Sequence, residues 1–152
     1  MTECDISTRG ARVSDFAAVN GLATLLVGFR ADRRASFDAT LASPDHDVIV
    51  AELDGAVIAY AHLMTYHDLS HGALAGELLG LVVRKDMRRQ GIGRRLLREV
   101  MRRATARGVG EFHINTKPDN EAARALYASL GAKMVGVQLE IDLASAAGQG
   151  GM

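Results

Sequence analysis

The 152-residue sequence contains a single cysteine, Cys4, so it can form neither an internal disulfide nor a cysteine-based zinc cluster. We interpret Cys4 as structurally incidental, because a catalytic cysteine needs a partner base and no other candidate residue lies near it in the chain. Long apolar runs are also missing, and none approaches the ~20 residues that a membrane-spanning helix needs. The first ten residues lack the apolar core of a signal peptide. These absences predict a cytoplasmic protein with no membrane partner.

Aromatic residues are scarce, since they make up 5% of the chain and tryptophan is absent. The scarcity bears on one strongly basic stretch, residues 84–107, in which ten of 24 residues are Lys or Arg and only two are acidic. A basic block of this kind indicates either a phosphate-bearing partner or the solvated face of a helix. No aromatic residue within it could stack on nucleic-acid bases, so we predict that nucleic acid is not the partner.

Proline is rare as well, with two residues, and no repeat or long linker divides the chain. Hydrophobic residues make up 48% of the sequence, which is enough for a core. We therefore predict a single domain over residues 1–143. The small, Gly-rich residues 144–152 are expected to form a disordered tail.

Hydrophobic periodicity and turn residues predict an α/β (α+β) fold. Strands are expected at 5–11, 47–53, 56–66, 77–83 and 111–117, with one or two more in 132–143. Helices are expected after Ser14, at 31–42, at 94–107 and at 120–130, and a loop at 67–76. The result is a mixed, mostly antiparallel sheet of six to seven strands flanked by about four helices, with one crossover from 77–83 to 111–117.

Two glycines, Gly91 and Gly93, stand between the predicted strand 77–83 and the helix that starts at Arg94. The first amides of a helix have no partner within it and the helix dipole is positive there, so this junction can bind a phosphate or pyrophosphate. Glycine lets the phosphate approach the backbone, and the flanking arginines add charged donors. Two other phosphate loops are excluded, because no Gly-Lys pair provides a P-loop and no third glycine completes the dinucleotide fingerprint.

The stretch LVVRKDMRRQGIGRRLL, residues 81–97, resembles the acetyl-CoA-binding signature of the GNAT superfamily of N-acyltransferases. The family motif [QR]-x-x-G-x-[GA] is met by Arg88, Gly91 and Gly93. The family expects an apolar strand before this loop and an amphipathic helix after it, and the periodicity predicts both.

A second stretch resembles another element of the same family, a helix with Asn, Ala and Tyr that ends in Leu-Gly. It is met by Asn120, Ala123 and Tyr127, followed by SLGA. Where the family commonly has an aromatic residue after that glycine, this chain has Ala132, which we interpret as a packing change. The family-like order of elements covers about residues 5–142.

The resemblance implies a GNAT-type fold, acetyl-CoA as cosubstrate, and a set of coenzyme contacts. The implied cofactor-binding residues are Leu81, Val82, Val83, Arg88, Arg89, Gln90, Gly91, Ile92, Gly93, Arg94, Asn120 and Tyr127. Among these, the backbone of the strand would pair with the pantetheine arm, the amide of Val83 would face the thioester oxygen, and the loop amides would hold the pyrophosphate. Asn120 would contact pantetheine.

Two residues are implied as catalytic. Tyr127 matches the tyrosine that similar enzymes place beside the coenzyme sulfur, where its hydroxyl can protonate the departing thiolate. Glu77 opens an apolar strand, and some family members carry a glutamate base near this position; many others carry an acid two or three positions later, where this chain has Leu79 and Gly80. A core tyrosine and an exposed strand-end glutamate are the structural alternatives.

A polar stretch, YHDLSH, contains His67, Asp68 and His71. Imidazole and carboxylate suit divalent ions, but this spacing in a loop is a weak ligand pattern and no HExxH motif is present. We predict that these three residues contact the substrate and that the protein has no metal site.

The resemblance implies an acetyl-CoA-dependent N-acetyltransferase. Because no cysteine nucleophile lies near the motifs, we predict direct transfer in a ternary complex to a small primary amine. Acetylation of a protein N-terminus or lysine stays open, as do a non-catalytic acetyl-CoA-binding module, a nucleic-acid-binding module and a homodimer. We expect an acidic acceptor side that suits a cationic amine; its acids are Asp38, Asp45, Asp47, Asp68, Glu77, Glu140 and Asp142.

Overall fold

The computed structural model of the chain describes residues 5–144, so Cys4 and residues 145–152 of the predicted tail lie outside the described residues. The chain divides into two compact units, Met1–Ile114 and Asn115–Met152. The first unit contains, in chain order, β1 (Ile6–Gly10), the 3-10 turn η2 (Val13–Asp15), α1 (Phe16–Val27), α2 (Arg34–Ala42), β2 (His46–Leu53), β3 (Ala56–Asp68), β4 (Ala73–Val83), the 3-10 turn η3 (Lys85–Met87), α3 (Ile92–Ala106) and β5 (Glu111–Ile114). The second unit contains α4 (Glu121–Ser129). A single domain over 1–143 stays a prediction.

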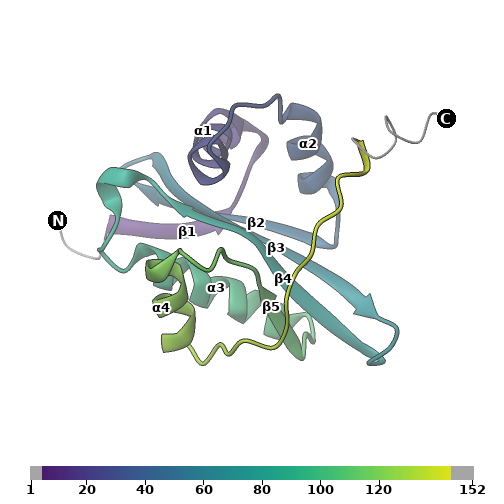
Figure 1. Ribbon diagram of the computed structural model, residues 1–152. Coiled ribbons are helices and arrows are strands. Elements are labelled where there is room, and N and C mark those ends of the chain that lie inside the picture. The colour runs from purple at the N-terminus through teal and green to yellow at the C-terminus, as the bar shows by residue number, and fades with distance from the viewer. Residues whose placement is uncertain (1–4, 145–152) are drawn as a thin grey trace. The chain divides into compact units, whose positions relative to one another are not determined.

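The first unit is built on a five-stranded sheet with the order β1-β2-β3-β4-β5. Neighbouring strands from β1 to β4 are antiparallel, and β5 runs parallel to β4. Because α3 connects these two parallel strands, it forms the predicted crossover. Figure 1 shows α1 and α2 on one face of the sheet and α3 on the other. The mixed, mostly antiparallel sheet and its four helices are therefore confirmed.

The predicted number of strands was too high, because residues 132–143 form no strand in the described part of the chain. Their apolar side chains are largely exposed; Val137 and Leu139, for example, are each 87% exposed. With its Val and Leu residues, this stretch has the composition of a strand. A strand forms, however, only where a neighbouring strand pairs with its backbone. The sheet consequently has five strands rather than six to seven.

The predicted loop at 67–76 was also wrong. β3 continues to Asp68 and β4 already begins at Ala73, so these two residues face each other across a tight turn at 69–72. Gly72 adopts a φ of 62°, in the left-handed region that this turn requires. The stretch is polar and Gly-rich, so it lacks the alternation that marks a strand, and its extended form follows from the register of the longer β3–β4 ladder.

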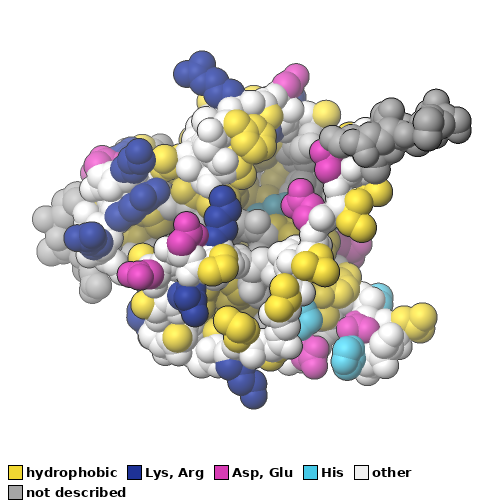
Figure 2. Space-filling view, in the orientation of Figure 1, with side chains coloured by type: hydrophobic (Ala, Val, Ile, Leu, Met, Phe, Trp, Pro, Cys, Tyr) yellow, Lys and Arg dark blue, Asp and Glu magenta, His cyan; other side chains and the backbone are white. Residues whose placement is uncertain are grey.

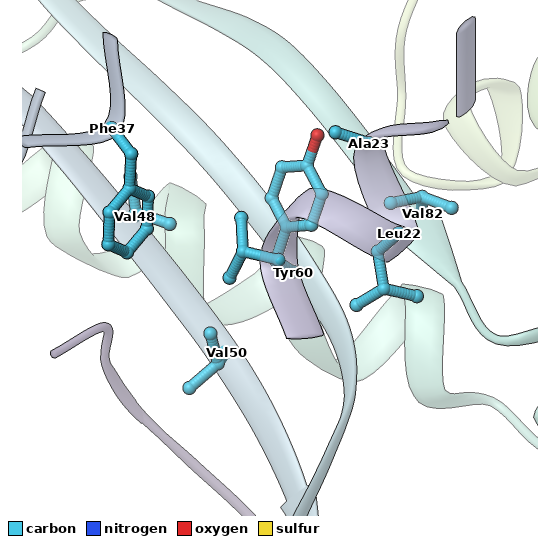
Figure 3. Packing of buried hydrophobic residues seen from close by; sticks show 8 residues of the cluster. Leu22, Ala23, Phe37, Val48, Val50, Tyr60 and Val82 are labelled. Carbon is cyan, nitrogen blue, oxygen red and sulfur yellow. The ribbon is translucent and has the colours of Figure 1, made fainter. Parts of the chain in front are cut away.

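Apolar side chains cover both faces of the sheet. On one face, residues of α1 and α2 pack against the sheet in a cluster that is drawn in Figure 3. The buried members are Val19, Leu22, Ala23, Phe37, Val48, Val50, Tyr60 and Val82. On the other face α3 buries its predicted stripe at Leu96, Leu97, Val100 and Ala104, whereas Met101 at its edge is 37% exposed. Each buried Leu or Val stabilises the fold by roughly 1.5–3 kcal/mol, and the arginines of α3 remain on its outer side.

An ion cluster connects the start of α1 to the sheet. Asp15 is buried and accepts hydrogen bonds from both Nη atoms of Arg9, at 2.7 and 3.0 Å, and from the Arg12 amide at 2.7 Å. Arg9 in turn donates to Glu52 on β2 at 3.0 Å. The hydrogen bond from Arg9 holds the pKa of Asp15 below its usual range.

None of the helices in residues 5–144 is long and apolar enough to cross a membrane.

Candidate active site

The central strand β4 has a bulge and an open edge. Its pairing with β3 shifts between His62, opposite Gly80, and Leu63, opposite Leu78, so Leu79 is an extra residue. Its pairing with β5 covers only Ala75–Leu78. Beyond the bulge, β4 is therefore paired with β3 only. In the part of the chain that the structure describes, no strand pairs with its other edge there.

The hydrogen-bond pattern shows which backbone groups face that open edge. The Arg84 amide donates to the Ile58 carbonyl at 2.8 Å, toward β3. Because the direction alternates along a strand, Val82 also bonds toward β3, whereas the amides and carbonyls of Leu81 and Val83 point away from it. The Val83 carbonyl accepts a hydrogen bond from Nε of Arg88 at 3.1 Å. An extended ligand could pair with the remaining groups as an added strand.

The glycine loop follows this edge directly. Arg89 and Gly91 both have left-handed backbones, with φ of 64° and 79°. Gly91 is the N-cap of α3, which begins at Ile92, two residues earlier than predicted. The first helical bond runs from the Arg95 amide to the Gly91 carbonyl at 3.0 Å. The amides of Ile92 and Gly93 therefore precede the first intrahelical donor and lie at the positive end of the helix dipole.

The loop is suited to an anionic ligand. A Cβ built on Gly91 would have no heavy atom within 4 Å, so open space adjoins the backbone there. The first turn of α3 contains no acidic residue. Arg88 and Arg89 are exposed, and Figure 2 shows Lys and Arg side chains gathered over the connection between β4 and α3. The arrangement fits a pyrophosphate.

Glu77 lies on β4 before the bulge, in a polar cluster that spans three strands. It pairs with Met64 on β3 and with His113 on β5, so all three side chains share a face of the sheet. Nδ1 of His113 lies 3.3 Å from the Tyr66 hydroxyl. Burial, followed by the charge of Glu77, raises the pKa of Tyr66. Sequence reasoning missed Tyr66 and His113, because only the register between the strands places them beside Glu77.

A cavity of about 310 Å³ opens on the face of the sheet that α1 and α2 cover. Its lining residues are Phe16, Val19, Asn20, Ala23, Arg33, Ser36, Phe37, Thr40, Val48, Tyr60 and His62. Nε2 of His62 lies 2.8 Å from Nδ1 of His46. Burial and the neighbouring His46 lower the pKa of His62 to about 4, so its imidazole is neutral at pH 7. Arg33 is consequently the one charged residue in this lining.

No acid lines this cavity, and the acidic acceptor side stays a prediction. Asp38 lies 3.2 Å from the guanidinium of Arg34. Asp47 lies 2.9 Å from Arg107, on the face of the sheet that α3 covers. Both carboxylates are paired with arginines: Arg34 stands four residues before Asp38 on the same helix, whereas only the fold brings Arg107 to Asp47.

Comparison with known proteins identifies the family. Residues 16–132 match the acetyltransferase (GNAT) family. The aminoglycoside N(6')-acetyltransferase type 1 of Serratia marcescens is 34% identical over 104 residues, which is 66% of this chain and 71% of that protein. The N-alpha-acetyltransferase RimI of Mycobacterium tuberculosis is 34% identical over 116 residues, covering 76% of this chain and 70% of RimI.

The chain belongs to the GNAT acetyltransferase family. It is therefore an acetyltransferase with acetyl-CoA as its acetyl donor. Solved structures agree on the fold. A putative acetyltransferase from Agrobacterium tumefaciens has a TM-score of 0.82 at 23% identity, covering 90% of this chain and 99% of that one. The aminoglycoside N-acetyltransferase AAC(6')-Iy in complex with CoA has a TM-score of 0.80 at 22% identity, covering 90% and 93%.

Two predicted site residues of this acetyltransferase lie in its second unit. Asn120 is the N-cap of α4, and its Oδ1 accepts a hydrogen bond from the Ala123 amide at 3.1 Å. Tyr127 lies seven residues later, on the same side of the helix. It is half-buried, and burial raises its pKa. Asn120 therefore has a structural role as a cap, whether or not it also contacts the coenzyme.

The predicted substrate residues lie at the far end of the β3–β4 hairpin, where Figure 2 shows His and acidic side chains together. The structure brings Asp68 and His71 to 2.7 Å, and each stabilises the charged form of the other, so the pKa of Asp68 is lowered and that of His71 is raised. His67 is exposed on β3. The hairpin tip is six residues along β4 from the Leu79 bulge, a distance of about 20 Å. In residues 5–144 no three metal-ligating side chains gather.

Proposed function

We propose that this acetyltransferase transfers the acetyl group of acetyl-CoA directly to a small primary amine, with both substrates bound at once. The observation that carries the proposal is the open edge of β4 beyond the Leu79 bulge, which lies between Glu77 and the glycine loop in the chain. No cysteine that could carry the acetyl group occurs in residues 5–144, which favours direct attack by the amine.

The backbone geometry of β4 and of the loop after it supports the proposed coenzyme contacts. We assign the outward groups of Leu81 and Val83 to the pantetheine arm, and the Val83 amide to the thioester oxygen, where a donor stabilises the negative charge that develops in the transition state. The amides around Gly91 and Gly93 hold the pyrophosphate, supported by the charged donors of the loop arginines. The full set is Leu81, Val82, Val83, Arg88, Arg89, Gln90, Gly91, Ile92, Gly93, Arg94, Asn120 and Tyr127.

Two side chains move protons in this proposal. An amine attacks only in its neutral form, and Glu77 accepts the proton directly or through water. His113 and Tyr66 lie beside Glu77 and hold it in a polar environment. Tyr127 donates a proton to the departing thiolate, and its raised pKa keeps the hydroxyl protonated at neutral pH.

The acceptor class is proposed from the size of the cavity. Its volume of about 310 Å³ lies at the small end of the range for small-molecule sites. This favours a small amine over a protein N-terminus, which is the acceptor class that the name of RimI indicates for that relative. A contact of His67, Asp68 or His71 with the acceptor stays a proposal, as do a cytoplasmic location and the absence of a nucleic-acid partner.

The test is a screen of primary amines and short peptides in which the release of free CoA thiol is followed. We expect turnover of at least one small amine. Tyr127→Phe should lower kcat by ~10²–10⁴-fold and leave the affinity for acetyl-CoA almost unchanged, because the ring stays and only the proton donor is lost. Turnover of peptides alone would refute the acceptor class. Turnover at the wild-type rate in Tyr127→Phe would show that this tyrosine only packs.

A further inference from the structure

The charge in the cavity between the sheet and the first two helices is positive, which is unexpected for an enzyme that binds amines. Arg33 lies at the start of α2 and is half-buried. The polar residues that line the cavity with it are neutral, namely Asn20, Ser36, Thr40, Tyr60 and His62. The positive charge of Arg33 would repel a cationic group, so the cavity lining suits a ligand group that is not cationic.

The guanidinium of Arg33 is held in place by uncharged groups. Its Nη1 donates to Oδ1 of Asn20 at 2.8 Å and to Oγ1 of Thr24 at 3.0 Å, and its Nη2 donates to the carbonyl of Phe29 at 2.8 Å. None of the ion pairs in residues 5–144 includes Arg33. The neighbouring Arg34, in contrast, is paired with Asp38 at 3.2 Å. Arg33 therefore keeps a positive charge that no carboxylate of the described chain neutralises.

The bonds of Arg33 also leave donors for a ligand. A guanidinium has five N–H groups in a planar fork, and the three short bonds use both Nη1 hydrogens and one Nη2 hydrogen. The Nε hydrogen and one Nη2 hydrogen remain as charged donors, and guanidinium donors are the kind that bind a carboxylate strongly. Because the arginine is already held in one position, little side-chain entropy is lost when a ligand binds.

The cavity lies one strand away from β4. Tyr60 and His62, which line the cavity, pair with Val82 and Gly80 on β4. Between these two residues stands Leu81, whose backbone amide and carbonyl point to the open edge of β4. Figure 3 shows Tyr60 standing up from the sheet with its hydroxyl directed toward α1. Neighbouring strands are about 4.8 Å apart, so β4 lies about 5 Å from this wall and a ligand at its open edge about 10 Å from it. A short molecule can span that distance.

On the basis of the proposed function, we infer that the acceptor amine carries a carboxylate, which binds Arg33 while the amine reaches across β4 toward the Leu79 bulge. A single guanidinium among neutral hydrogen-bonding groups matches one negative charge, which favours a carboxylate over a phosphoryl dianion. The substrate class is thus an ω-amino acid or a similar aminocarboxylate, rather than a polyamine.

The test compares acceptors of equal length that differ only in charge. The wild-type enzyme is assayed with 4-aminobutyrate, its neutral amide and 1,4-diaminobutane, and with the corresponding six-carbon series. We expect kcat/KM for the aminocarboxylate to exceed that for the neutral amide by about tenfold or more in at least one series, because a charge-assisted hydrogen bond is the stronger kind. Arg33→Met should abolish this preference, and the matched Arg34→Met variant should keep it.

The outcomes separate the two levels of the proposal. If the wild-type enzyme acetylates the neutral or cationic amines as well as the aminocarboxylates, the inference about Arg33 is wrong and the proposed function stands. If peptides are acetylated and no small amine is, the proposed function fails. Arg33→Met also removes hydrogen bonds to α1, so its melting temperature is measured alongside; if it does not fold, the wild-type ratio alone decides.

Discussion

Two glycines at opposite ends of α3 allow the proposed role of the glycine loop to be tested with an internal control. Gly91 is the N-cap of the helix with a φ of 79°, and Gly108 follows its C-terminus with a φ of 89°. A Cβ at either position would meet no heavy atom within 4 Å. Alanine at each site should therefore destabilise the fold through its unfavourable backbone conformation, without a steric clash.

The expected effects on stability are equal. A left-handed backbone costs an L-residue roughly 1–2 kcal/mol. In a chain of this length each kcal/mol lowers the melting temperature by about 2–4 °C. Gly91→Ala and Gly108→Ala should therefore each lower the melting temperature by roughly 2–8 °C, as measured by calorimetry or by tyrosine and near-UV signals.

The expected effects on binding differ. A methyl group on Gly91 fills the space beside the amides of Ile92 and Gly93, where the pyrophosphate is proposed to lie. Loss of one charge-assisted hydrogen bond weakens binding by about 10–100-fold. Titration calorimetry with CoA should show this loss for Gly91→Ala and wild-type affinity for Gly108→Ala. Equal affinity in the two variants would refute the assignment of the loop to the pyrophosphate.

Two further predictions concern carboxylates. Glu77→Gln should lower kcat/KM by ~10²–10⁴-fold and remove the acidic limb of the pH–rate profile, because the amide cannot take up a proton; an unchanged profile would mean that solvent or another group deprotonates the amine. Hydrogen bonds from Arg102 and Arg103 lower the pKa of Glu99 to about 2 from its usual 4.5. Since the folded-state pKa is depressed, Glu99 stabilises the fold above about pH 4.5 and loses that contribution as the pH falls toward 2. Glu99→Gln should therefore be less stable than wild type at pH 7, by about 1 kcal/mol after allowance for solvent screening, and equally stable near pH 2 in chemical unfolding; a difference that persists at low pH would contradict this origin.

Local pattern was sufficient for several features of the molecule. The short apolar run at 77–83 is typical of a central strand, and Leu96, Leu97 and Val100 repeat at helical spacing, so the sequence indicates β4 and α3. Gly91 between them marks the turn into α3, where its φ of 79° suits glycine. These features depend on neighbours along the chain, which the sequence displays directly.

Other features depend on which strands pair and in what register. The bulge at Leu79 and the open edge beyond it arise because β3 and β5 pair with different lengths of β4. The same registers bring Tyr66 and His113 beside Glu77 and extend the hairpin through residues that resemble a loop. Residues 132–143 have the composition of a strand and form none, because a strand also needs a partner for its backbone.

The charge of the cavity between the sheet and the first two helices was decided in the same way. The sequence contains 18 acidic residues (Asp and Glu) and 18 basic residues (Lys and Arg), so composition alone cannot say which of them face a ligand. Helical spacing pairs Asp38 with Arg34, whereas packing pairs Asp47 with Arg107 and leaves Arg33 bonded to neutral groups. An ion pair forms between side chains that the fold brings within a few ångströms, so the sequence determined which charges exist and only the tertiary structure decided which of them remain available to a substrate.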